Sequence, residues 1–113
     1  MHEMALCQRI IEIVDETARS QGFSRIVSVR LEIGALSSVE PEAIAFGFDV
    51  ASRNTAAEGC RLRIDRPPGQ AYCIDCGDST VIASRSDPCP RCGGYQLLVT
   101  GGEELRVMEL EVE

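Results

Sequence analysis

Cys73-Ile-Asp-Cys76 and Cys89-Pro-Arg-Cys92, separated by twelve residues, form the stretch that decides how this chain folds. Each Cys-x-x-Cys pair can curl its backbone around one ion and place both sulfur atoms about 2.3 Å from it. Four thiolates complete the tetrahedral shell of zinc, and a completed shell is typical of a structural site. The spacing therefore predicts one structural zinc ion. Two disulfides, or an iron ion held by the same four ligands, are the alternatives.

The composition is that of a small acidic protein. The chain has 113 residues and a formal charge of −7, and its eleven basic residues are scattered among eighteen acidic ones. Nucleic-acid binding needs a basic face, so this pattern argues against DNA or RNA as a partner. No apolar run has membrane-spanning length and no signal peptide is evident. We therefore expect a cytoplasmic protein without a membrane partner, in a compartment where paired cysteines more often bind metal than form disulfides.

The N-terminal part of the chain predicts a helix followed by a strand. Residues 3–21 show the spacing of a helix with one buried face, which consists of Leu6, Ile10, Ile13, Val14 and Thr17. Cys7 lies beside this face, and we interpret it as a small buried hydrophobic residue. Residues 24–34 then alternate between apolar and polar side chains, which is typical of a half-buried strand.

A second helix and a second strand follow. Pro41 suits the first turn of a helix, whose inward stripe is expected to contain Ile44, Phe48 and Ala51, widened by Phe46 and Val50. Residues 60–65 alternate again, with Cys60, Leu62 and Ile64 on the apolar side. We interpret Cys60, like Cys7, as a thiol of the core.

The remaining chain predicts an inserted zinc module and a returning strand. Pro67-Pro68-Gly69 can continue neither a helix nor a strand, so the module is expected to begin there, with short strands near Val81 and over residues 96–100. The segment 104–112 is too apolar to extend freely into solvent and should rejoin the first sheet. Its alternation changes parity, which either a bulge near Val107 or burial of the strand on both faces would explain. The predicted fold class is α+β. A small sheet with two helices covers residues 1–66 and 104–113, and a four-cysteine zinc ribbon covers residues 67–103.

The single histidine, His2, is the most informative residue outside the cysteines. Without a second histidine or a Gly-rich phosphate loop, the chain offers no catalytic constellation, and we expect a protein that is not an enzyme. If Met1 is retained, its α-amine, the amide nitrogens of His2 and Glu3, and the imidazole can close chelate rings around one ion. A planar set of nitrogens suits Ni²⁺ or Cu²⁺. The alternative is an incidental polar residue on a frayed terminus.

Three features, in this order along nearly the whole chain, resemble the HypA/HybF family of nickel-incorporation proteins for [NiFe]-hydrogenase maturation. They are Met1-His2-Glu3 at the start of a helix, Leu31-Glu32-Ile33-Gly34 before the Pro41 helix, and the two Cys-x-x-Cys pairs. The resemblance implies an α/β nickel-binding domain, a zinc domain and a role as a nickel metallochaperone. It assigns Met1, His2 and Glu3 as nickel ligands, and it assigns Cys73, Cys76, Cys89 and Cys92 as zinc ligands.

The resemblance also implies partners. Family members work with a nickel-handling GTPase and deliver nickel to the [NiFe]-hydrogenase large subunit, and some also serve urease maturation. We expect a monomer or a weak homodimer. Glu40 departs from the short capping residue expected before Pro41, which puts the cap of that helix in doubt. The competing hypothesis is a zinc-ribbon adaptor that binds nucleic acid or transcription machinery.

Overall fold

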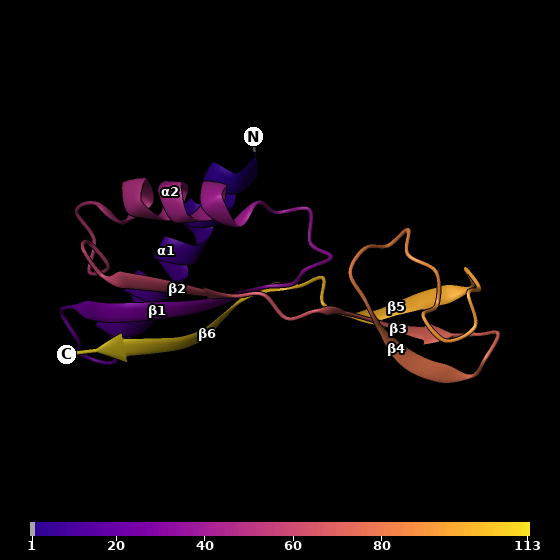
Figure 1. The fold of residues 1–113 in the computed structure, drawn as a ribbon. Coiled ribbons are helices and arrows are strands. Elements are labelled where there is room, and N and C mark those ends of the chain that lie inside the picture. Colours follow the sequence, from indigo (N-terminus) through magenta and orange to yellow (C-terminus); the bar gives the residue numbers. More distant parts are fainter. Residues whose placement is uncertain (1) are drawn as a thin grey trace. The chain divides into compact units, whose positions relative to one another are not determined.

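The computed structural model describes residues 2–113, with side chains described from residue 3 onward (Figure 1). The chain forms two compact units. The first consists of Met1–Leu31, Val39–Ile64 and Arg106–Glu113, and the second consists of Glu32–Ser38 and Asp65–Leu105. The observed architecture confirms the α+β class. The sequence predicts two domains, 1–66 with 104–113 and 67–103, and this division into domains stays a prediction.

The first unit is built from two helices and a three-stranded sheet. Helix α1 spans His2–Ser20 and helix α2 spans Pro41–Ser52. The sheet has the order β2-β1-β6, with bounds Arg61–Asp65, Ile26–Ile33 and Leu105–Val112. The predicted final strand therefore does rejoin the first sheet, and Figure 1 shows both helices on the same side of it. The parity change predicted near Val107 lies at Met108 and Glu109, two consecutive exposed residues.

Helix α1 turns a different face to the core from the one predicted. Its buried apolar residues are Cys7, Ile10, Ile11, Val14 and Ala18. The predicted burial of Ile13 was wrong, because this side chain is 43% exposed, and Thr17 is exposed as well. The buried set keeps the spacing of three and four residues but starts at Cys7 rather than at Leu6. The predicted helical spacing is confirmed, but the buried face of α1 is rotated about the helix axis by a fraction of a turn from the predicted one.

Helix α2 begins at Pro41, as predicted, and it packs closely against α1. The side chain of Glu40 makes no capping hydrogen bond, although its carbonyl accepts one from the Ile44 amide at 3.1 Å. A Cβ at Gly47 would lie 2.8 Å from the Sγ of Cys7, so this close approach of the helices requires glycine. Ile44 and Phe48 are buried, but the predicted burial of Phe46 was wrong, since that ring is 70% exposed.

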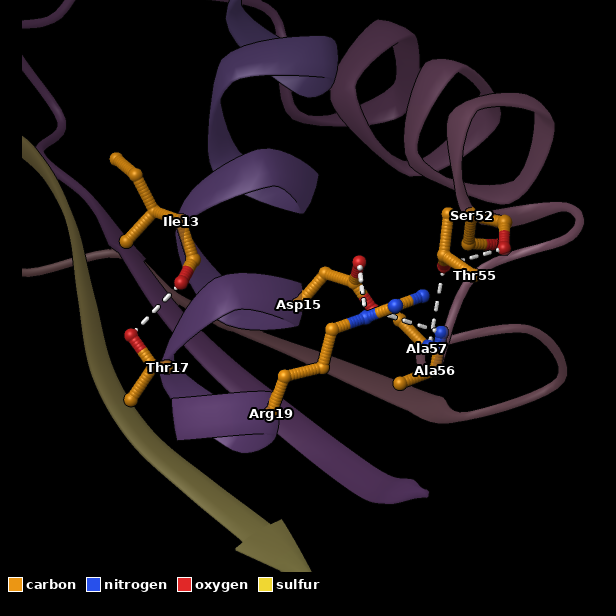
Figure 2. A network of polar contacts seen from close by, with 8 residues as sticks. All are labelled: Ile13, Asp15, Thr17, Arg19, Ser52, Thr55, Ala56 and Ala57. Carbon is orange, nitrogen blue, oxygen red and sulfur yellow. Dashed lines mark hydrogen bonds and ion pairs between the residues drawn. The ribbon is translucent and has the colours of Figure 1, made fainter. Parts of the chain in front are cut away.

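A polar network fixes the end of α1 to the loop after α2 (Figure 2). The carboxylate of Asp15 accepts a hydrogen bond from the Ala56 amide at 2.9 Å and forms an ion pair with Arg19 at 3.0 Å. Within the loop, the Thr55 hydroxyl donates to the Ser52 carbonyl at 2.6 Å and accepts from the Ala57 amide at 3.1 Å. These bonds give partners to backbone groups that have none within a helix or strand. They therefore hold the loop in one conformation.

The second unit is a small antiparallel ribbon. Its sheet has the order β4-β3-β5, with bounds Asp78–Ile82, Gly69–Cys73 and Leu97–Gly101. Strands β4 and β5 lie where the sequence predicted short strands. The sequence does not predict strand β3, because Pro67-Pro68-Gly69 indicates the end of regular structure, whereas the strand begins directly after the two prolines at Gly69.

The ribbon has a very small apolar core. Leu36, Ala71 and Ile82 are buried together, and the half-buried Leu97 and Val99 pack against them. Leu36 comes from the segment Glu32–Ser38, far from the ribbon in sequence, and its amide donates to the Gly102 carbonyl at 2.8 Å. None of the described helices is long and apolar enough to cross a membrane.

Candidate metal centre

The four cysteines predicted as metal ligands come together at the end of the ribbon sheet. The sulfur atoms of Cys73, Cys76, Cys89 and Cys92 all lie within 4.8 Å of one another. The distance is 3.6 Å from Cys73 to Cys92 and 3.7 Å from Cys76 to Cys89. A zinc tetrahedron with bonds of about 2.3 Å has edges of about 3.8 Å. The spacing of the four thiols therefore fits a tetrahedral ion of that size.

None of these cysteines is joined to another. All six cysteines of the chain are free, and the closest sulfur pairs are far longer than a disulfide bond of about 2.05 Å. The arrangement thus supports the metal-binding interpretation of the two Cys-x-x-Cys pairs over the disulfide alternative. Four thiolates suit both zinc and iron, so the donor set is compatible with either ion.

Two matching turns present the four sulfurs. In the first, the Gly77 amide donates to the Cys73 carbonyl at 2.8 Å, and in the second the Gly93 amide donates to the Cys89 carbonyl at the same distance. Both glycines have a positive φ, +71° and +76°, which other residues adopt only under strain. The first cysteine of each pair is buried and the second is exposed. Each turn therefore places one cysteine inside the ribbon and the other at its surface.

The backbone around the second turn prepares one sulfur for metal binding. The amide N–H groups of Cys92 and Arg91 lie against the Cys89 sulfur and lower its pKa to about 7, because they stabilise the thiolate. The pKa of Cys76 is raised to about 12, chiefly through its hydrogen bond with Cys73. Because a metal binds the thiolate form of cysteine, binding of a divalent ion at this centre is coupled to the release of protons.

The predicted nickel ligands lie at the edge of the described chain. Met1 lies outside the described residues, and so does the side chain of His2, whose backbone opens α1. Glu3 is half-buried in the first turn of the same helix. The structure brings together the four cysteines that the sequence predicts as zinc ligands, whereas Met1, His2 and Glu3 as nickel ligands stay a prediction.

Cys7, one turn further along α1, belongs to the core rather than to a metal site. Its side chain is fully buried, and its Sγ donates to the Ile44 carbonyl of α2 at 3.3 Å. Burial, and secondarily the charge of Glu3, raise the pKa of the Cys7 thiol. The thiol therefore stays protonated at neutral pH, which confirms its interpretation as a small buried residue.

Fold and site together define a small α+β protein with a closed four-cysteine metal centre. The family model for "Hydrogenase/urease nickel incorporation, metallochaperone, hypA" matches residues 1–112, and the chain belongs to this HypA family.

Curated relatives match along the whole chain. A protein named "Hydrogenase maturation factor HypA" from Alkalilimnicola ehrlichii is 54% identical over 113 residues, and "Hydrogenase maturation factor HypA 2" from Bradyrhizobium diazoefficiens is 56% identical over 113 residues. In both comparisons the match covers 100% of each chain.

Solved structures share the fold. The solution structure of the "Ni metallochaperone HypA from Helicobacter pylori" aligns with a TM-score of 0.70 at 22% identity, and covers 99% of this chain and 97% of the other. A second "Solution structure of HypA protein" gives a TM-score of 0.74 at 23% identity, with coverage of 100% and 97%. These likenesses support the two-unit α+β architecture described above.

Proposed function

We propose that this protein is a nickel metallochaperone that binds Ni²⁺ at its N-terminus and delivers it during [NiFe]-hydrogenase maturation. The observation that carries the proposal is the family match over residues 1–112, together with relatives named as hydrogenase maturation factors. The protein acts by binding and handing over a metal, not by catalysis, and it works in the cytoplasm. The acidic composition and the family match both argue against the alternative of an adaptor for nucleic acid.

The four-cysteine centre holds zinc in a structural role. Four thiolates fill the coordination shell of Zn²⁺ and leave no position for a substrate or an activated water. Two of the sulfurs are buried in the ribbon, which has only a few apolar side chains around them. The ion therefore takes the place of a larger hydrophobic core. Cys73, Cys76, Cys89 and Cys92 are its ligands.

The start of α1 suits a nitrogen-rich nickel site. The helix begins at His2, and the first amide N–H groups of a helix have no acceptor within the helix. Deprotonating the amides of His2 and Glu3 therefore breaks no helical hydrogen bond. The two amide nitrogens then carry two negative charges, which balance the two positive charges of Ni²⁺. With the α-amine of Met1 and the imidazole of His2, they supply a planar set of four nitrogens.

Delivery requires protein partners. In line with the family, we propose a nickel-handling GTPase of the maturation pathway and the hydrogenase large subunit, with urease maturation proteins as a further recipient. A labile nitrogen site at the end of the chain is suited to transfer, because a partner can reach the ion without unfolding the carrier. The zinc centre, with its buried sulfurs, is not suited to rapid exchange.

The nickel site is tested by a titration of untagged protein with two variants. His2→Ala removes the imidazole while keeping a strong helix former at that position. One extra residue before Met1 keeps the imidazole but displaces the α-amine from its chelate ring. Native protein should bind one Ni²⁺ per chain, and both variants should lose this site, while Gln8→Ala, an exposed change further along α1, should bind normally.

The zinc content of each variant serves as the control for folding. Both N-terminal variants should keep their zinc. Normal nickel binding by the extended protein would remove the α-amine from the ligand set. Normal binding by His2→Ala as well would refute the N-terminal site altogether.

A further inference from the structure

A groove runs along the edge strand β2 of the first unit. It has a volume of about 410 Å³. Its walls are Ala45, Phe48 and Ser52 from α2 and, facing them, Cys60, Leu62 and Ile64. The last three are alternate residues of one extended segment, and all are half-buried. Asp49 is the one charged residue among the described residues that line the groove, and it forms an ion pair with Arg53 at 3.5 Å.

The strand beside the groove has an unpaired edge. β2 is the first strand in the order β2-β1-β6, so in the described part of the chain it pairs only with β1. Edge strands present backbone N–H and C=O groups to which another extended chain can add. The residues between the groove-lining ones are Arg61 and Arg63, which are exposed on the opposite face. This edge therefore combines an apolar groove on one face with two cations on the other.

The opposite edge of the same sheet shows what kind of strand fits such a pattern. There β6 alternates half-buried Leu110 and Val112 with exposed glutamates. The glutamates contact side chains on and just before β1: Glu109 with Arg30 at 3.8 Å, Glu111 with Ser28 at 3.1 Å, and Glu113 with Arg25 at 3.4 Å. An extended segment that alternates apolar and acidic residues thus satisfies one edge of this sheet.

We propose that the free edge of β2 and its groove bind an extended segment of a partner protein in which apolar and acidic residues alternate. The segment adds to the sheet as a further strand, at about 4.8 Å from β2. Because alternate side chains of a strand point to opposite faces, its apolar residues enter the groove between β2 and α2. Its acidic residues then lie on the face of Arg61 and Arg63, where opposite charges on neighbouring strands attract.

Protection against aggregation explains only half of these features. Charged side chains on an edge strand discourage accidental pairing, and that role accounts for the two arginines. It does not account for an open groove lined by Leu62 and Ile64, since an edge that only has to repel other strands gains nothing from exposed apolar surface beside it. A groove and a row of cations on the two faces of one edge are features of a selective acceptor.

Nuclear magnetic resonance with the zinc-loaded full chain tests this proposal. The probe is a synthetic peptide of about seven residues that alternates valine and glutamate, long enough to span β2 at about 3.4 Å per residue. Amide signals of residues 60–65 and of the groove side of α2 should shift as the peptide is added. A peptide of the same composition with the valines grouped at one end, and one with lysine for each glutamate, should bind at least tenfold more weakly.

Variants and a modified peptide separate strand addition from simple adhesion. The pair Arg61→Ala and Arg63→Ala should weaken binding roughly fivefold, and the matched pair Arg9→Ala and Arg85→Ala, which removes the same charge elsewhere, should not. Methylating the peptide nitrogens that face β2 should abolish binding. Equal binding of the methylated or scrambled peptide, shifts confined to other surfaces, or self-association of the chain through this edge without peptide binding would each overturn the proposal.

Discussion

The two units of this protein are stabilised in different ways. The first buries large aliphatic side chains from both helices and the central strand, among them Ile10, Val14, Val29, Leu31 and Ile44. The ribbon buries only Leu36, Ala71 and Ile82 as a cluster, and several of its larger apolar residues are exposed. A unit with so little buried apolar surface needs another source of free energy. From this difference we infer that burial stabilises the first unit and that the proposed zinc ion stabilises the second.

The largest expected effect comes from removing one metal ligand. Cys73→Ser should abolish zinc binding and disorder residues 70–102, because structural zinc contributes on the order of 10 kcal/mol to the folding of such sites. Chelation of zinc from the native protein should have the same effect. Cys7→Ala, which empties a small volume in the first unit, should keep the metal and cost about 1–2 kcal/mol. Metal analysis and amide hydrogen exchange measure both outcomes. Full ribbon order in a protein shown to lack zinc would contradict the inference that the metal stabilises the second unit.

A smaller effect, in the other unit, is expected from a cavity. Ile44→Ala removes a fully buried side chain of α2 and should lower the free energy of unfolding of the first unit by about 2–5 kcal/mol. Denaturant unfolding followed by helical circular dichroism measures the loss. Zinc content should stay at one ion per chain. A loss of zinc in this variant would mean that the two units do not depend on separate sources of stability.

The sequence predicted the clustering of the four cysteines better than the buried faces of the helices, for a physical reason. Cysteine spacing limits where the sulfurs can lie, so the clustering of Cys73, Cys76, Cys89 and Cys92 could be predicted before any fold was known. Helix faces depend on tertiary packing. Ile13 and Phe46 satisfy an apolar pattern but point to solvent, whereas Ile11 is buried because α1 is rotated by a fraction of a turn. Apolar spacing defines a stripe only to within about one residue on each side.

Other features lay beyond what local patterns contain. Leu36 stands in what reads as a connector, yet it belongs to the ribbon core. The Ala35 amide donates to the Pro67 carbonyl and the Leu36 amide donates to the Gly102 carbonyl, both more than thirty residues away in the sequence. Asp15 reads as a solvent-facing acid but accepts a hydrogen bond from the distant Ala56 amide. Long-range backbone partners of this kind have no signature in a single sequence.

The smallest expected effect concerns a surface ion pair beside the metal. Arg91 forms an ion pair with Asp78, and both side chains are more than half exposed. Arg91→Ala should therefore change stability by less than about 1 kcal/mol. The backbone amide of residue 91, which stabilises the Cys89 thiolate, is kept in this variant. The rate of zinc loss to a chelator should be nearly that of the native protein. A loss of metal as severe as in Cys73→Ser would show that this ion pair, rather than the thiolates and backbone, holds the site together.

Our central proposal is that the two regions bind different metals through different chemistry: nickel through nitrogens at the start of α1, and zinc through thiolates in the ribbon. It is tested most directly by adding Ni²⁺ to zinc-loaded, untagged protein and recording the visible spectrum and the content of both metals together. We expect one nickel per chain, a weak absorption typical of planar nitrogen coordination, and an undiminished zinc content. Strong thiolate-to-nickel absorption, with zinc released in proportion to nickel bound, would contradict it.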